Sequence, residues 1–564
     1  MEILKSPEGE GNRSDPLGAD WKVIHLLNRL GYGPRPGDID RVRAMGIEAY
    51  IEQQLHPESI EESQLEPRLR PYATLSLSAH EMAQKYPLPR PRQLRRGKGS
   101  RRDSGGRSGG NGMDPGMAPQ GMDADPRAEL RRLRQAQKEI YLDLAEARLI
   151  RAVYSSRQLL EVMTDFWFNH FNVFVRKKPI SLLATRFEYD VIRPHALGRF
   201  EDLLLGVSRS PAMLVYLDNW VSSASQGTIR NRMRNRLRDR HALGGRGSHS
   251  YPGKGSGRKG RRQEAMEAFG ATPALFKAKG LNENYGRELL ELHTVGVEAG
   301  YTQKDVIEAA ACLTGWTITD PHQGARFQFQ PLMHEEGTHR VLGRSFKQKG
   351  VEQGEALLRM LAHHPDTART ISTKLVRRFV SDQPPPWLVA AAASTFQASG
   401  GDIRQVLKTI FSSPRFFSPL AYRAKIKKPL ELVASSIRAL KGEIHWAHGL
   451  LRWMSQMGEA LYLCPQPTGY PDTAADWINT NSLLTRLNFA LALASNRIAG
   501  VDAKPASGRL FDRMQLPQPD DLQLERTRSL LSRPGVGRPA RTGNGRPLVL
   551  ASAFRLGAPD FQKR

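Results

Sequence analysis

Apolar residues recur every three or four positions through most of the chain, which is the spacing of helices that bury one face. One such run follows Thr302 through Val306 and Ala310 and stops at Gly315. Other runs have the same period, and they cover residues 351–363, 367–380, 387–398, 402–412 and 429–441. The pattern predicts a mainly α fold, a multi-helical globular body.

One stretch departs from this period. At Arg326–Gln330, Phe327 and Phe329 alternate with polar residues, and a turn-like segment then leads to a second short extended stretch at Val341-Leu342. The alternation predicts a small β-hairpin embedded among the helices.

Composition divides the chain into a helical domain and appendages. Residues 90–126 and 222–263 are rich in Gly, Arg and Ser and poor in apolar residues, so we predict two disordered basic insertions. We expect residues 1–21 to be a flexible N-terminus and residues 496–564, punctuated by Pro and Gly, to be a mostly irregular basic tail. The predicted helical domain is residues 22–495.

The net charge of +26 lies almost entirely in the appendages, within residues 88–135, 221–263 and 501–564. Binding of nucleic acid or another polyanion would therefore depend on them. In the second insertion, arginines occupy every second position; a helix would scatter them around its axis, whereas an extended chain would line them along one side. No aromatic residues interleave to stack bases. The segment is either a solvated loop or a polyanion-binding element formed by Arg230, Arg232, Arg234, Arg236, Arg238 and Arg240.

Cysteine content and the N-terminal sequence bound the setting of the protein. Cys312 and Cys464 are far apart and form no CxxC pair, so neither a disulfide framework nor a cysteine-based zinc site is predicted. The first 21 residues lack the apolar stretch of a secretory signal, and no run of about 18 apolar residues occurs. We expect a cytoplasmic protein without a membrane span.

Eight segments, in order, carry a resemblance to a known family. They include DFWFNHF at 165–171 and NENYGRELLELHTVGV at 282–297, and the others lie at 25–55, 193–220, 301–317, 333–346, 369–386 and 467–490. Over residues 22–495 the chain thereby resembles the uncharacterised bacterial helical proteins called domain of unknown function 1800.

The resemblance implies a helical fold and a protein partner from a companion family, domain of unknown function 1501. It names no reaction, and many members of the family look exported. Two positions depart from the family pattern: Phe168 stands where a histidine is usual, and Tyr470 stands where a tryptophan is usual. The first departure removes one of two histidines from a place where a site would be sought.

The segment 282–293 holds the densest group of polar candidates. Asn284, Arg287, Glu288 and Glu291 fall at spacings of three and four, so they would share one helical face. Two carboxylates beside a guanidinium could hold a divalent metal or divide acid and base roles, since like charges raise one pKa. An ion-pair network between helices, with Arg287 bonded to Glu291, would explain the same pattern.

His170 follows Asn169 at the end of an aromatic helix. As a ligand it would suit zinc, iron or manganese together with Glu288 and Glu291, provided that the fold brings the two segments together. A hydrogen-bonded core histidine is the alternative. Other polar candidates, each explained equally by a cap, a turn or core packing, are Arg193, His195, Asp218, Asn219 and His334.

No HExxH, GxSxG or Walker sequence occurs, and no GxGxxG opens a helix. The sequence leaves three hypotheses. The chain is a helical scaffold or partner-binding protein, or it is a metal-assisted hydrolase or oxidoreductase with a His/Glu cluster, or it binds a polyanion through its Arg-rich insertion.

Overall fold

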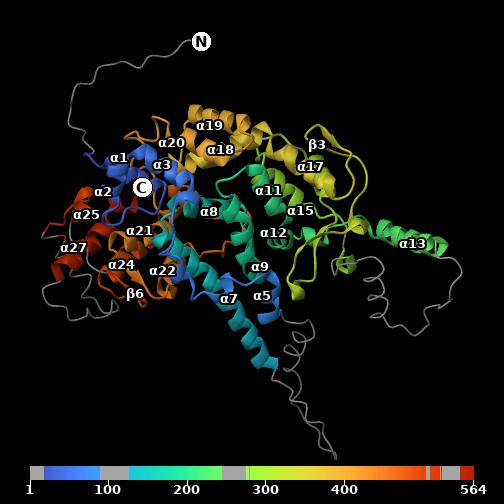
Figure 1. The fold of residues 1–564 in the computed structure, drawn as a ribbon, viewed down its shortest axis with the longest axis horizontal. Helices are drawn as coiled ribbons and strands as arrows, with labels where there is room; N and C mark the ends of the chain where they lie inside the picture. The colour runs from blue at the N-terminus through green and yellow to red at the C-terminus, as the bar shows by residue number, and fades with distance from the viewer. Residues whose placement is uncertain are drawn as a thin grey trace, which may run out of the picture.

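The computed structural model describes residues 18–88, 126–243, 275–278, 280–503, 509–520, 523 and 546–564. Helices predominate in these residues, which confirms the predicted mainly α body (Figure 1). The first half of the chain holds α1 (Trp21–Arg29), α2 (Asp38–Met45), α3 (Ile47–Leu55), α4 (Glu66–Leu69), α5 (Ala79–Lys85), α7 (Pro126–Tyr154), α8 (Gln158–His170), α9 (Ile180–Arg186), α10 (Arg193–His195), α11 (Phe200–Arg209), α12 (Pro211–Tyr216) and α13 (Gln226–Leu243). The second half holds α15 (Asn284–Glu288), α16 (Gln303–Cys312), α17 (Val351–Ala362), α18 (Pro365–Phe379), α19 (Pro386–Ala398), α20 (Ile403–Phe411), α21 (Pro429–Ala439), α22 (His448–Gln456), α23 (Ala474–Trp477), α24 (Thr480–Ala494), α25 (Arg509–Arg513), α27 (Arg546–Gly557) and α28 (Pro559–Gln562).

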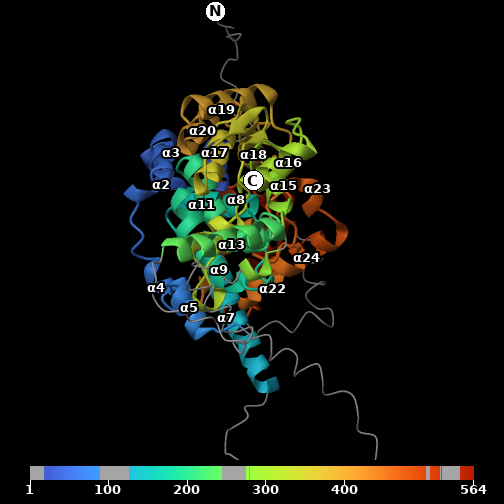
Figure 2. The same cartoon turned by 90° about the vertical axis from the view of Figure 1, so that its right-hand side faces the viewer.

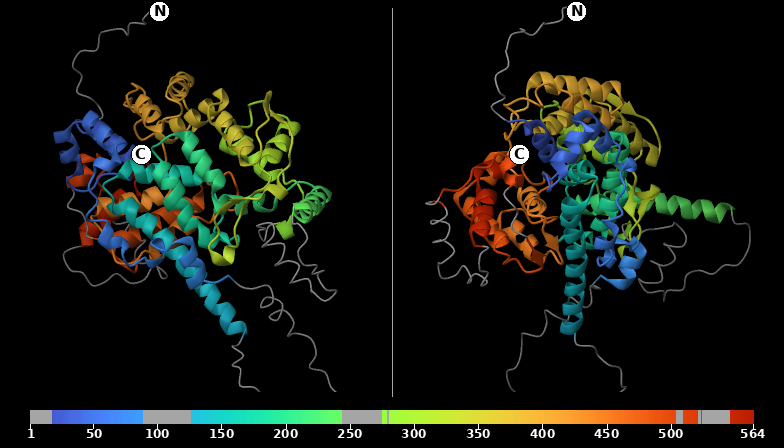
Figure 3. Two further views of the ribbon diagram at one scale, coloured as in Figure 1. Left: turned by 45° about the vertical axis from the view of Figure 1, so that its right-hand side comes forward. Right: turned by 60° about the vertical axis from the view of Figure 1, so that its left-hand side comes forward.

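Most buried apolar side chains belong to one contiguous core. The long helix α7 contacts α8, α9, α21 and α22, and its N-terminal end extends beyond the body in all views (Figures 1, 2 and 3). Helices α18, α19 and α20 pack against one another at the top of Figure 1, while α24 and α27 pack together at the lower left. The end of α8 lies between these groups.

The boundaries of α16 follow directly from its sequence. The Thr302 hydroxyl accepts a hydrogen bond from the backbone N–H of Asp305, and the Asp305 carboxylate accepts one from the backbone N–H of Thr302. The helix ends at Cys312, and the chain turns at Gly315 with a φ of +79°. The predicted run from Thr302 to Gly315 is thereby confirmed.

Helix α15 packs closely on α16 through Gly286. A Cβ at this position would lie 2.6 Å from the carbonyl oxygen of Val306, so the approach requires glycine. After α15 the chain continues as the π-helix η6 (Leu289–His293), and α9 continues in the same way as η3 (Phe187–Ile192). A π-helix widens the turn, so residues after Glu288 leave the face that an α-helix would give them.

Three two-stranded antiparallel sheets occur in the described residues: β1 (Trp316–Ile318) with β2 (Phe327–Phe329), β3 (His339–Val341) with β4 (Arg344–Phe346), and β5 (Glu443–Ile444) with β6 (Val501–Asp502). The small embedded hairpin was therefore predicted correctly as a feature but with a different pairing. Leu342 and Gly343 have φ values of +47° and +78°, which form a two-residue turn, so Val341 pairs with Arg344 and not with β2.

The second predicted insertion is ordered over its first half, which corrects the prediction for residues 222–243. Ser222 and Ser223 are buried, and α13 begins at Gln226. Ile229 anchors α13 by packing in a small separate apolar cluster with Leu275 and Met333, a long-range contact that composition does not reveal. Residues 90–125 and 244–274 lie outside the described residues.

The tail from 496 to 564 was predicted to be mostly irregular, yet its described part contributes to the body. Helix α27 packs along α24, and Leu491 and Ala553 belong to one apolar cluster between them. The side chain of Arg564 is buried and pairs with Glu431 at 3.0 Å. Contacts with distant segments therefore order this region in spite of its Pro-rich composition.

Candidate functional site

Two segments that are about 300 residues apart in the sequence are fixed together at the end of α8. The side-chain amide of Asn169 donates to the carbonyl oxygen of Tyr470 (2.8 Å), and its oxygen accepts from the Tyr470 backbone N–H (2.7 Å). The amide of Asn172 donates to the carbonyl oxygens of Cys464 and Gln466 (2.9 and 2.7 Å). These bonds hold the loop that contains Cys464 and Tyr470 against α8.

His170, the last residue of α8, is buried between α18 and η6. Lys374 Nζ lies 3.0 Å from His170 Nδ1, and His170 Nε2 lies 3.3 Å from the carbonyl oxygen of His293. Because an ammonium only donates, Nδ1 accepts from Lys374 and the proton of the ring sits on Nε2, which donates to His293. Burial, helped by the nearby positive charge of Lys374, lowers the pKa of His170 well below its ordinary value. The imidazole is therefore neutral at pH 7.

Lys374 is the cation of this group, and its surroundings are unusual for a lysine. Burial lowers its pKa, while the negative charge of Asp472 acts in the opposite direction. Asp472 itself forms its ion pair with Lys428, at 3.0 Å. Within the described residues, no carboxylate forms an ion pair with Lys374.

Lys374 also lines a cavity of about 320 Å³ between η6, the loop that follows it and α18. This volume lies at the lower end of the range for small-molecule sites. The cavity wall mixes both signs of charge, with three cations from α18 and three carboxylates from different segments. The charged residues are Arg369, Lys374 and Arg377, and Glu291, Glu298 and Asp366.

A second group of charges is buried next to α8, and each of its carboxylates contacts an arginine. Arg148 donates to Asp165 (2.8 Å) and to Glu188 (2.5 Å), and Tyr462 also donates to Glu188 (2.5 Å). Arg193 forms a bidentate pair with the carboxylate of Glu161 at 2.8 Å for both contacts. We call this group the buried ion network; its members are Arg148, Glu161, Asp165, Glu188, Arg193 and Tyr462.

The polar residues of 284–291 have different partners. Arg287 bonds to Gln303 (2.8 Å) and lies 3.6 Å from Glu283, so the expected pair with Glu291 is absent. Asn284 is exposed. Burial and the neighbouring charge of Glu291 raise the pKa of Glu288, while Glu291 accepts a hydrogen bond from Tyr301 and lines the cavity. Because the chain is a π-helix from Leu289, the α-helical spacing expected between Arg287 and Glu291 does not hold.

The predicted metal-ligand set does not assemble. Nowhere in the described residues do three or more His, Cys, Asp or Glu side chains form a group that could hold a metal ion. His170 contacts Lys374, whereas Glu291 lines the cavity and Glu288 is not among the residues that line it. These residues therefore do not fit the divalent metal that the sequence suggested.

The remaining candidates have structural partners. Arg193 belongs to the buried ion network, and the His195 ring hydrogen-bonds to the carbonyl oxygen of Val191 (2.8 Å). Asp218 is exposed beside Lys177. Further partners are backbone carbonyls: Asn219 donates to those of Leu313 and Trp316, and His334 contacts that of Thr314.

The arginines of the second insertion lie on α13, which projects from the body (Figure 1). Arg230, Arg234, Arg236 and Arg238 are exposed, whereas Arg232 bonds to the carbonyl oxygen of His334. Because the segment is helical, the arginines point around its axis and do not form one stripe. Polyanion binding stays a prediction, as do the scaffold role and the companion-family partner. Among the described residues, no helix has the length and apolar character needed to cross a membrane.

The sequence reasoning missed Lys374 and His293. Lys374 stands within a helical run next to Ile371 and Leu375, which are buried, so its position near a core-facing stripe was a usable signal. His293 belongs to the same segment as Glu291 and was passed over because no partner was visible. Burial and the charge of Lys374 lower the pKa of His293 to about 3, so it too is neutral.

Comparison with known proteins identifies a family but no named relative. No curated protein and no solved structure is found to match the chain. A family model described as a protein of unknown function (DUF1800) matches residues 25–563, which includes α8, η6, α18 and the C-terminal helices beyond the predicted limit of 495. The chain therefore belongs to the DUF1800 family, whose function is unknown.

Proposed function

We propose that the cavity between η6 and α18 binds a small polar oxo acid and that the amine of Lys374 reacts with its carbonyl group. One observation carries the proposal: Lys374 lines the cavity while its Nζ lies 3.0 Å from the neutral ring of His170. A lysine that is desolvated and lacks a carboxylate partner holds more of its amine in the neutral, nucleophilic form.

The other cavity residues indicate the ligand class. Arg369 and Arg377 line the same cavity, and guanidinium groups bind carboxylates through paired hydrogen bonds. Glu291 and Asp366 line it too, so the wall also offers acceptors for hydroxyl or amine groups of the ligand. In a small acid with an adjacent carbonyl, the carboxylate binds the guanidinium groups, and further hydroxyl or amine groups donate to the carboxylates of the wall.

The chemistry needs only the amine and the ligand. The nitrogen of neutral Lys374 adds to the carbonyl carbon, and the π electrons of the carbonyl move to its oxygen. Loss of that oxygen as water, with the two amine protons, gives an imine. His170 orients the amine by accepting a hydrogen bond at Nδ1, and it is a positioning residue.

Reductive trapping tests this proposal. The protein is incubated with glyoxylate and sodium cyanoborohydride at pH 7.5, and carboxymethyl adducts are mapped by peptide mass spectrometry. We expect Lys374 to be modified faster than the exposed Lys347, although Lys374 is the more buried. Acetaldehyde, which has the carbonyl but no carboxylate, is the matched reagent and should show a smaller preference, because only the activated amine favours Lys374 with this reagent.

Arg369→Gln provides the matched variant, because it removes an exposed cation of the wall without touching Lys374. We expect slower labelling of Lys374 by glyoxylate and unchanged labelling by acetaldehyde. Labelling of Lys374 by glyoxylate that is no faster than that of Lys347 would show that the amine is not activated and would overturn the proposal.

A further inference from the structure

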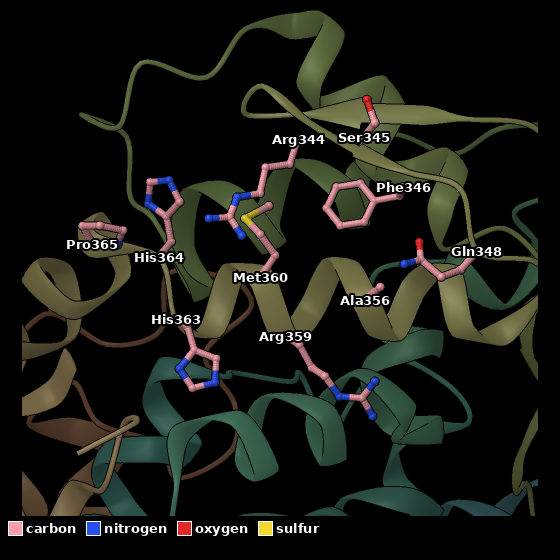
Figure 4. A pocket seen from close by; sticks show the side chains of 10 residues that line it. All are labelled: Arg344, Ser345, Phe346, Gln348, Ala356, Arg359, Met360, His363, His364 and Pro365. Atoms are coloured by element: carbon pink, nitrogen blue, oxygen red, sulfur yellow. The ribbon is translucent and has the colours of Figure 1, made fainter. Parts of the chain in front are cut away.

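A second pocket, of about 540 Å³, lies between β4, α17 and the start of α18 (Figure 4). Its wall is partly apolar, with Phe346 from β4 and Ala356 and Met360 from α17. Its rim is basic, with two arginines and two histidines, and it has no acidic lining residue. The pocket is separate from the Lys374 cavity, since the two share no lining residue.

Two of the four basic residues already contact carboxylates. Arg359 lies 3.3 Å from Glu201 and 3.3 Å from Glu355, and His363 Nε2 lies 2.7 Å from Glu201. In Figure 4 both side chains point away from Met360, toward the helix below. They form part of the packing between α17 and α11 and add little to the pocket.

Arg344 is different, because it has no ion-pair partner within the described residues and its side chain is exposed. Figure 4 shows its guanidinium pointing from β4 into the pocket, on the side where His364 and Met360 lie. An unpaired guanidinium beside an apolar wall is a binding group for an anion.

The ring of His364 supplies a second hydrogen-bond donor through its tautomer. Its Nδ1 accepts a hydrogen bond from the backbone N–H of Asp366 (3.2 Å), which caps α18. The proton of the neutral ring therefore sits on Nε2. Within the described residues, the one ion-pair contact of this ring is with Asp366, 3.6 Å from Nδ1, so Nε2 is left to donate.

We propose that this pocket binds a small amphiphilic carboxylate, with Arg344 and His364 Nε2 holding the carboxylate and Phe346, Ala356 and Met360 covering an apolar chain. The volume suits a short fatty acid better than a large ligand, since small-molecule sites of this kind span about 300–1,000 Å³. Phe346 also packs in the main core, whereas Ala356 and Met360 pack against that core and keep part of their side chains exposed at the pocket.

Calorimetric titration with octanoate tests the proposal on the full chain. We expect saturable binding of octanoate, with acetate and octanamide at least about tenfold weaker, because acetate lacks the apolar chain and octanamide lacks the charge. Equal affinities for octanoate and acetate would show that the apolar wall does not contribute to binding, and this result would overturn the proposal. No binding of octanoate at millimolar concentration would overturn it as well.

Variants assign the two donors. Arg344→Gln should weaken octanoate binding about tenfold or more. Arg340→Gln, on the same hairpin but with its side chain outside the pocket, should leave it unchanged. His364→Asn keeps an acceptor for the Asp366 N–H and so keeps the helix cap, but it removes the Nε2 donor and should weaken binding by a smaller factor. Octanoate binding that is unaffected by both Arg344→Gln and His364→Asn would contradict the assignment.

Discussion

The buried ion network and the Lys374 site both involve side chains of α8, but their charges are paired differently. In the network, each carboxylate faces an arginine: Glu188 accepts from Arg148 and Tyr462, and Glu161 binds Arg193 with both oxygens. At the Lys374 site, the cation contacts a neutral imidazole, and Asp472, whose negative charge acts on it, is paired with Lys428.

This difference separates structural charges from charges that are available for chemistry. A buried pair that is complete is costly to break but has no spare hydrogen-bonding capacity. A buried lysine without a carboxylate partner makes the folded state less stable, and it persists where the amine has a use. The sequence cannot distinguish the two cases, because both are basic residues next to an apolar stripe.

Glu188→Gln should have the largest effect of the changes that test this contrast. The substitution leaves Arg148 and Tyr462 facing an uncharged amide in the interior, and loss of one partner of a buried pair costs about 3–5 kcal/mol. The free energy of unfolding from urea denaturation measures it. Glu66→Gln is the control, since the Arg70–Glu66 pair is 72% and 78% exposed; its effect should stay within about 0.5 kcal/mol. Equal losses in the two variants would contradict the contrast.

Glu459 gives a smaller effect that depends on pH. It is fully buried, and burial raises the pKa of its carboxyl to about 7. Folding therefore favours the protonated acid: its contribution to stability is complete below the unfolded pKa, near 4.3, and is lost as the pH rises through about 7. Glu459→Gln keeps an acceptor for the backbone N–H of Leu430 and removes the charge.

We expect Glu459→Gln to be more stable than the wild type by about 1–3 kcal/mol at pH 8 and equal to it at pH 4. Urea denaturation at the two pH values measures the difference. The same gap at both pH values would mean that the carboxyl is not protonated on folding.

The fold was predictable where local signals dominate. The run from Thr302 to Gly315 contains its own cap and its own stop, and α16 follows it. The order of 222–243 was not predictable from composition, because one buried residue, Ile229, anchors α13 to segments more than 40 residues away. The pairing of β2 was missed for a related reason, since the positive φ at Leu342 depends on the turn that it completes.

The candidate site was predictable only in part. His170 contacts Lys374 and Glu291 lines the same cavity as Lys374, whereas the sequence suggested a metal ion shared by His170 and Glu291. The sequence does not show that η6 is a π-helix, which changes the spacing of Glu291. It also does not show that the imidazole of His170 contacts Lys374, which lies about 200 residues later in the chain. Geometry of this kind depends on long-range packing, for which residue spacing holds no information.

Lys374→Met gives the smallest effect and the most direct test of the contrast. The methionine keeps an unbranched apolar stem beside His170 and removes a desolvated charge that has no carboxylate partner among the described residues. We therefore expect the free energy of unfolding to rise by about 1 kcal/mol. We also expect the trapped glyoxylate adduct to be lost. Lys428→Met is the matched change on a lysine that has a partner, at 3.0 Å from Asp472. It should destabilise the protein, because the half-buried aspartate then loses its ion-pair partner. If Lys374→Met instead lost stability as Lys428→Met does, then Lys374 would be a structural cation of the same kind as Arg148, and the contrast between the network and the cavity would fail.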